Sequence, residues 1–192
     1  MIWDDPNLIK VLQNSGVAVM PTDTLYGIVG KALDLVVVEH IYALRKRSPD
    51  KPCIILIGNI GELGKFSIVL SEQQQSKLKE SLFALSGIKD SEPLSIILDC
   101  PDKTLSFLHR GTNTLAFRIP INEDLRKLLL QTGPLVAPSA NIEGMPPAQN
   151  IDEAKKYFGN SISLYIDGGA ITGKASKVIK LNQDGSVVTV RE

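Results

Sequence analysis

The segment Leu-Val-Ala-Pro-Ser-Ala-Asn, residues 135–141, ends a short apolar run with small and polar residues. Small side chains permit a ligand to approach the backbone closely, and a Ser hydroxyl beside an Asn amide offers both donors and acceptors. A Ser/Asn turn explains the same residues equally well. The segment therefore predicts a buried strand that ends either in a turn or in a binding site, with Ser139 and Asn141 as candidate contacts.

A second segment of this kind is Pro-Thr-Asp-Thr-Leu-Tyr-Gly, residues 21–27, which follows the apolar run 17–20. Ligands in α/β sheets gather where strands end. A turn stabilised by Thr and Asp is the alternative. In an extended chain Thr24 and Tyr26 share one face, which favours a small polar ligand over a turn.

Helix and strand signals alternate between and around these segments. Caps and apolar periodicity predict helices over residues 6–14, 34–44, 71–87, 123–131 and 150–158. Apolar runs predict strands over residues 17–20, 53–57, 94–98, 114–119, 135–137, 163–166, 177–181 and 186–190. This order indicates an α/β (α+β) fold, a twisted sheet of mixed parallel and antiparallel strands flanked by helices, in one domain over residues 1–192.

Two charged stretches are not explained by packing. Arg45, Lys46, Arg47 and Lys51 place four cations within seven residues at the end of the second helix. They can clamp a triphosphate, or complement the helix dipole while solvated; nearby prolines stiffen the segment and favour the first role. Arg118 lies in an apolar strand, so it either reaches solvent at the strand end or meets an anion.

Thr114 lies four residues before Arg118 and therefore shares its strand face, which is a candidate ligand surface. Near the C-terminus, Asp-Gly-Gly at 167–169 and Gly-x-x-Ser ending at Ser176 form a hydroxyl-bearing loop, which is weak evidence alone. His40 and His109 lack the partners of a hydrolytic or metal site.

The composition of the chain further limits the kinds of protein and ligand site that the sequence allows. The chain has 192 residues, 43% of them hydrophobic, and its 21 basic and 21 acidic residues cancel, so a nucleotide or nucleic acid must meet a local basic cluster. The two cysteines lie in or beside buried strands, which argues against a disulfide framework or zinc site. With no signal peptide and no membrane-spanning apolar run, the cytoplasm is the expected location, without membrane contact. Rossmann and Walker glycine loops are both missing.

Taken together, the motifs resemble those of the YrdC-like threonylcarbamoyl-adenylate synthase family. The family pattern runs Pro-Thr-(Glu/Asp)-Thr-x-Tyr-Gly, Lys-x-Arg before Asn or Lys and Pro, Thr/Ser-x-Ala-x-Arg-x-Pro, Ser-Ala-Asn, and Asp-Gly-Gly with Gly-x-x-Ser, and this chain has the motifs in that order. The resemblance implies a YrdC-like sheet with a basic concave cavity. It also implies that L-threonine, bicarbonate and ATP, the last with Mg²⁺, give threonylcarbamoyl-AMP and pyrophosphate.

The resemblance also implies site residues and partners. L-threonine contacts would be Thr24, Tyr26, Arg118 and Ser176, and ATP contacts would be Arg47, Lys51, Thr114, Ser139 and Asn141. No residue is an obvious nucleophile and no direct protein ligand to a metal is expected, so positioning and electrostatics would drive the reaction. Threonylcarbamoyl-transferase proteins would use the product to modify tRNA beside the anticodon, and tRNA itself is a possible partner.

Four positions depart from the family pattern. Arg45 replaces the first Lys of Lys-x-Arg, Glu92 replaces a Gly, Leu56 replaces a His that some members have, and Lys177 follows Ser176 where Thr is usual. Two alternatives therefore stay open. One is a module of this fold that binds double-stranded RNA or tRNA without synthase activity, and the other is an adenylate-forming enzyme for another carbamoyl substrate.

Overall fold

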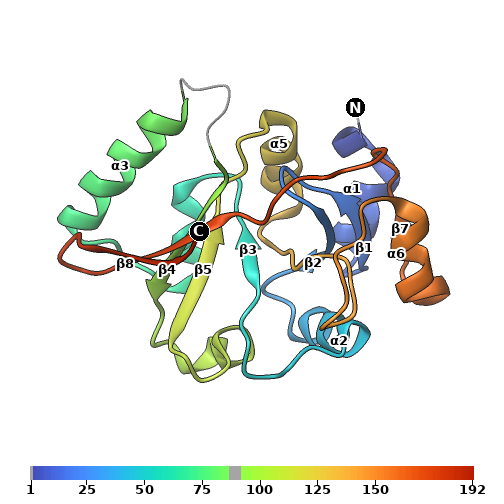
Figure 1. The fold of residues 1–192 in the computed structure, drawn as a ribbon. Coiled ribbons are helices and arrows are strands. Elements are labelled where there is room, and N and C mark those ends of the chain that lie inside the picture. The colour runs from blue at the N-terminus through green and yellow to red at the C-terminus, as the bar shows by residue number, and fades with distance from the viewer. Residues whose placement is uncertain (1, 87–91) are drawn as a thin grey trace.

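Nine strands form one mixed sheet within residues 2–86 and 92–192, which the computed structural model describes (Figure 1). Their order across the sheet is β7-β1-β2-β6-β3-β5-β4-β8-β9. The strands are β1 (Ala18–Pro21), β2 (Tyr26–Lys31), β3 (Ile54–Leu56), β4 (Leu94–Asp99), β5 (Thr114–Arg118), β6 (Leu135–Val136), β7 (Leu164–Tyr165), β8 (Lys177–Leu181) and β9 (Val187–Arg191). The pairs β1/β7, β3/β5 and β4/β8 are parallel and the others antiparallel, so the predicted mixed sheet is confirmed.

The helices begin where the sequence offers caps. They are α1 (Pro6–Gln13), α2 (Leu35–Arg45), α3 (Glu72–Ser86), α4 (Ser106–His109), α5 (Glu123–Thr132) and α6 (Ile151–Phe158), with 3₁₀ turns at Ile2–Asp4, Ile60–Phe66, Lys103–Leu105 and Gly159–Ser161. The Asp5 carboxylate accepts from the first turn of α1, and Ser71 and Gln74 exchange hydrogen bonds at the start of α3. The predicted α3 end at Gly87 lies outside the described residues. None of the helices in residues 2–86 and 92–192 has the length and apolar character needed to cross a bilayer.

Alternation along the strands sends side chains into two apolar layers on opposite faces of the sheet. In β1, Val19 joins a core with α2 and α6, whereas Ala18 and Met20 join a second core with α1 and α5. Figure 1 shows α1 beside α5 at one end of the sheet and α3 at the other. The second core covers only the half of its face around β1, β2, β6 and β3. The rest of that face, over β5, β4 and β8, is left open for a site.

Strand β2 was not predicted from the sequence, and it is the main difference between the predicted and the observed fold. Gly27 and Gly30 interrupt its apolar pattern, and glycine lowers strand propensity. The packing explains Gly30, because a Cβ there would lie 2.4 Å from Val37 Cγ1 of α2. Helix α4 and the 3₁₀ turn over Ile60–Phe66 were also not predicted. The helices and strands that were predicted are present within a few residues of their expected ends.

Candidate functional site

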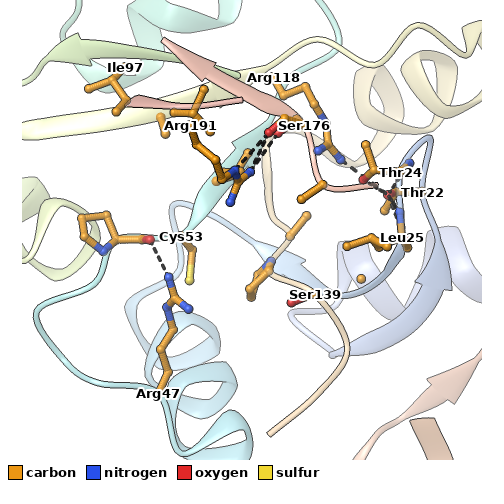
Figure 2. A pocket seen from close by; sticks show the side chains of 18 of the residues that line it. Thr22, Thr24, Leu25, Arg47, Cys53, Ile97, Arg118, Ser139, Ser176 and Arg191 are labelled. Atoms are coloured by element: carbon orange, nitrogen blue, oxygen red, sulfur yellow. Dashed lines mark hydrogen bonds between the residues drawn. The ribbon is translucent and has the colours of Figure 1, made fainter. Parts of the chain in front are cut away.

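A cavity of about 620 Å³ occupies the open half of the sheet face (Figure 2). Its floor is built from side chains that alternate on β3, β5, β4 and β8, namely Ile54, Thr114, Ala116, Arg118, Ile97 and Val178. The chain segments before β2 and after β6 close one side, and the end of α2 closes another. The face shared by Thr114, Ala116 and Arg118 therefore lines the cavity, as their spacing predicted.

One end of the cavity gathers hydroxyl groups around a buried guanidinium. Arg118 Nη2 lies 3.5 Å from Thr22 Oγ1, which is in turn 3.0 Å from Thr24 Oγ1. The same Nη2 lies 3.1 Å from Asp23 Oδ1, and both side chains of this ion pair are about 95% buried. The anion that Arg118 meets is thus Asp23, from the segment 21–27.

The Arg118 guanidinium keeps its charge in a largely buried position. Burial lowers the pKa of its guanidinium, the Asp23 carboxylate opposes that shift, and neighbouring Arg191 adds to it. Its Nε has no hydrogen-bond partner in the described part of the chain. A buried guanidinium with a free donor and a second cation close by is suited to a carboxylate or phosphate.

Arg191, at the end of strand β9, lines the cavity and was not predicted as a site residue from the sequence. Arg191 Nη2 donates to the carbonyl of Ser176 at 2.7 Å, and Ser176 Oγ lies 2.8 Å from Ser95 Oγ. Val178 pairs with Arg191 whereas Ile179 pairs with Thr189, so Val190 is an extra residue in a β-bulge. Because of the bulge, Val190 and Arg191 both line the cavity instead of alternating between faces.

Tyr26 supports the site from behind. Its phenol donates to the carbonyl of Gly169 and accepts from the amide of Gly168, both at 2.8 Å, so the hydroxyl is engaged by the loop at 167–169. Burial is the main cause that raises the pKa of Tyr26, which keeps the phenol neutral at physiological pH. Tyr26 is one of the residues that line the cavity, and its hydroxyl anchors the loop that leads to Ser176.

Tyr26→Phe is expected to lower the free energy of unfolding by about 1–3 kcal/mol, because it leaves the Gly168 amide and the Gly169 carbonyl without this partner. Urea denaturation measures the effect. Tyr157→Phe is the matched control, since its hydroxyl bonds the Pro146 carbonyl at an exposed position; a change below about 0.5 kcal/mol is expected there. Equal losses in the two variants would show that the Tyr26 hydroxyl does not anchor the loop.

The opposite end of the cavity carries the basic segment that follows α2. Arg47 donates to the carbonyls of Lys51 and Pro52, both at 2.9 Å, which holds the segment in a tight turn beside Cys53 (Figure 2). Arg45, Arg47 and Ser139 line this end. Burial raises the pKa of the Cys53 thiol, so it stays protonated and is a poor nucleophile.

Two of the predicted ATP contacts lie outside the cavity lining. Lys51 Nζ lies 2.5 Å from a carboxylate oxygen of Glu143, and its side chain is more than half exposed. The amide of Asn141 is engaged within the protein, accepting from Arg45 and donating to the carbonyls of Ile142 and Met145. The other predicted contacts line the cavity: Thr24, Tyr26, Arg47, Thr114, Arg118, Ser139 and Ser176.

The remaining departures from the family pattern lie away from the lining. Leu56 is fully buried in the second core, Glu92 is exposed, and Lys177 pairs with Glu192 at 2.8 Å. Glu92 is therefore not among the side chains that a ligand in this cavity would meet. Thr22 and Thr112, like Arg191, line the cavity without having been predicted.

No cluster of three or more His, Cys, Asp or Glu side chains suited to a metal ion occurs within residues 2–86 and 92–192. The side-chain oxygens that line the cavity belong to hydroxyl groups: Thr22, Thr24, Tyr26, Thr112, Thr114, Ser139 and Ser176. Together with its guanidinium groups, this lining favours an anionic, hydrogen-bonding ligand over a metal bound directly by protein carboxylates.

Comparisons with known proteins identify the family of the chain. Residues 10–192 match the Sua5/YciO/YrdC family, described as "Telomere recombination". The threonylcarbamoyl-AMP synthase of Pyrococcus abyssi is 31% identical over 165 residues, which cover 85% of this chain and 46% of that protein. The chain thus spans about half the length of that relative.

Solved structures extend the likeness to the fold. The crystal structure of P. abyssi Sua5 complexed with L-threonine superposes with a TM-score of 0.80 at 27% identity, covering all of this chain and 54% of that one. Escherichia coli YciO superposes with a TM-score of 0.78 at 23% identity, covering 97% and 87%, which is a likeness of fold. By the match over residues 10–192, the chain belongs to the Sua5/YciO/YrdC family.

Proposed function

We propose that this protein is an L-threonylcarbamoyladenylate synthase, which converts L-threonine, bicarbonate and ATP into threonylcarbamoyl-AMP and pyrophosphate. The observation that carries the proposal is the arrangement of the cavity. A hydroxyl-rich end centred on Arg118 and a cationic end containing Arg47 share the floor strand β5. Relatives that carry this activity in their names support it at family level.

The hydroxyl-rich end suits an α-amino acid. The guanidinium of Arg118, which lines this end, can receive the carboxylate of threonine, while Thr24 and Ser176 offer hydroxyl groups to its amine and side chain. Tyr26 contributes by fixing the loop that carries Ser176. Water exclusion in this buried corner strengthens each of these polar contacts.

The cationic end suits the phosphates of ATP. Arg47 lines this end of the cavity, Thr114 and Ser139 add hydroxyl groups, and Lys51 reaches the ligand only by leaving Glu143. Mg²⁺ would arrive with ATP and be held chiefly by the phosphates, since the described lining carries no carboxylate. It would supply charge neutralisation at the polyphosphate.

The reaction then needs no protein nucleophile. The amine nitrogen of threonine adds to the carbon of bicarbonate with loss of water, giving a carbamate whose oxygen attacks the α-phosphorus. The bond between the α-phosphorus and the bridging oxygen breaks, and pyrophosphate leaves with that electron pair. Arg118 orients the attacking group and the cationic end stabilises the leaving group, which is catalysis by positioning and electrostatics. The product would serve threonylcarbamoyl-transferase proteins that modify tRNA.

The deciding experiment measures pyrophosphate release from Mg²⁺–ATP and bicarbonate, with and without L-threonine. Release that depends on both threonine and bicarbonate is expected, with L-serine and L-valine as matched amino acids that lack the methyl or the hydroxyl group. Release that is indifferent to threonine would refute the proposal. Salt-sensitive tRNA binding without any turnover would instead favour an RNA-binding module of this fold.

A further inference from the structure

The N-terminal 3₁₀ turn, Ile2–Asp4, packs against the segment from which the hydroxyl-rich end of the cavity is built. Ile2 and Trp3 lie on the second core, and the turn contacts α5 (Figure 1). The family match begins at residue 10, so this turn precedes the matched part of the chain. Trp3 is the single tryptophan of the sequence and is partly buried. None of its contacts has a part in the function proposed above.

Trp3 holds the peptide group that joins Pro21 to Thr22. The indole Nε1 donates to the carbonyl of Pro21 at 3.0 Å. On the other side of the same peptide bond, the amide of Thr22 donates to the carbonyl of Leu25, also at 3.0 Å. Because a peptide group is planar, holding both its oxygen and its nitrogen sets the direction in which the chain continues into Thr22.

The residues after this peptide group carry its position to the buried guanidinium. Thr22 Oγ1 lies 3.0 Å from Thr24 Oγ1 and 3.5 Å from Arg118 Nη2. The next side chain, Asp23, places Oδ1 3.1 Å from the same Nη2. A displaced peptide group would therefore move both the hydroxyl group and the carboxylate that surround Arg118.

The same turn also contacts the loop after β7. A Cβ at Gly168 would lie 2.6 Å from Pro21 Cγ and 3.3 Å from Ile2 Cδ1, so the missing side chain lets this loop close on both residues. The amide of Gly168 donates to the hydroxyl of Tyr26 at 2.8 Å. The N-terminal turn thus contacts both of the segments that Tyr26 joins at the hydroxyl-rich end.

We propose that Trp3 is a positioning residue for the hydroxyl-rich end of the cavity. Its indole N–H holds the carbonyl of Pro21 and thereby fixes Thr22 and the Arg118 ion pair where the ligand binds. Trp3 is not among the described residues that line the cavity, so it acts through the peptide group and does not touch the ligand. That this ligand is L-threonine rests on the proposed function.

The test compares steady-state pyrophosphate release by the native full chain and by Trp3→Phe, which keeps an aromatic ring and removes the indole donor. KM for threonine is expected to rise at least about threefold, because a smaller fraction of the protein is in the binding arrangement. The kcat should stay within about twofold, since saturating threonine draws the segment back into that arrangement. KM for Mg²⁺–ATP should also stay within about twofold.

Gln13→Met is the matched control for a lost N–H donor. The side-chain amide of Gln13 donates to the carbonyl of Gln131 at 3.1 Å on the surface, and its loss should leave both KM values at the native level. A merely structural role of Trp3 would lower the thermal midpoint of Trp3→Phe without changing KM for threonine. That result would overturn the inference.

A second measurement uses the native protein alone. Because the sequence has one tryptophan, a proton–nitrogen correlation spectrum contains one indole signal, from Trp3 Nε1. L-threonine added without nucleotide should shift this signal, since the ligand settles the segment that the indole holds, and Mg²⁺–ATP alone should leave it in place. A signal that saturating threonine does not move would overturn the inference. If Trp3→Phe does not fold, this spectrum decides.

The synthase function and the role of Trp3 can fail separately. Native protein whose indole signal moves with threonine but which releases no pyrophosphate would refute the synthase function and support the role of Trp3. Threonine-dependent release with the same KM for threonine in the native protein and in Trp3→Phe would do the reverse.

Discussion

Arg118→Met is expected to lower kcat/KM for threonine at least about a hundredfold, which corresponds to about 3 kcal/mol of lost transition-state stabilisation. Arg118 is the cation of the hydroxyl-rich end, and its Nε has no partner within the described residues. In the proposed function, removing it would deprive the amino-acid carboxylate of its counter-ion in a water-poor corner, where charge-assisted hydrogen bonds count most. Steady-state pyrophosphate release at varied threonine measures the loss.

The same substitution leaves Asp23 buried without its ion-pair partner at 3.1 Å. Breaking a buried pair in this way typically costs about 3–5 kcal/mol of stability, so loss of activity in the single variant has two explanations. The double variant Arg118→Met with Asp23→Asn separates them. Neutralising Asp23 should restore much of the stability, seen in urea denaturation, without restoring threonine use.

Lys156→Ala, an exposed cation on α6, is the surface control and should change neither quantity appreciably. Recovery of activity along with stability in the double variant would mean that Arg118 serves the fold and not the substrate. The single variant Asp23→Asn adds one more contrast, because it keeps Arg118 while freeing it from its internal anion. The fold and the site are thus tested on the same pair of residues.

Features set by neighbours in the chain were predictable from the sequence. The Asp5 cap of α1 and the reciprocal Ser71 and Gln74 bonds of α3 form within a few residues, so their chemistry is local. The shared cavity face of Thr114 and Arg118 follows from strand alternation alone. These are cases in which propensity, capping and tertiary packing agree.

Features set by distant contacts were not predictable in the same way. Helix α2 packs closely over strand β2 at Gly30, where a side chain would not fit. The glycine that this packing requires weakens the local sequence signal for a strand. Arg191 reaches the cavity through a bulge, and a register shift leaves no mark in the residue pattern. The hydrogen bond from Arg45 to the amide oxygen of Asn141 joins residues 96 positions apart, so no local pattern in the sequence indicates it.

The loop between β7 and β8 supplies a second large expected effect, through Gly173. A Cβ at this position would lie 2.1 Å from the carbonyl oxygen of Thr24, which is backbone and cannot rotate away. Gly173→Ala must therefore push the loop from Thr24, and Ala175 and Ser176 of the same loop line the cavity. We expect KM for threonine to rise at least about tenfold, with about 1–3 kcal/mol of lost stability from overpacking.

Nucleotide affinity should change less than about twofold in Gly173→Ala, because Arg47 and Ser139 lie at the other end of the cavity. This split between the two substrates distinguishes a local displacement from general unfolding. Gly64→Ala is the matched control, since a Cβ there meets no atom within 4 Å, and both substrates should bind as in the native protein. If Gly173→Ala and Gly64→Ala both used threonine as the native protein does, the close contact between this loop and Thr24 would not be needed for threonine use. Because the substitution adds one methyl group and changes no charge, it tests only whether the loop must lie this close to Thr24.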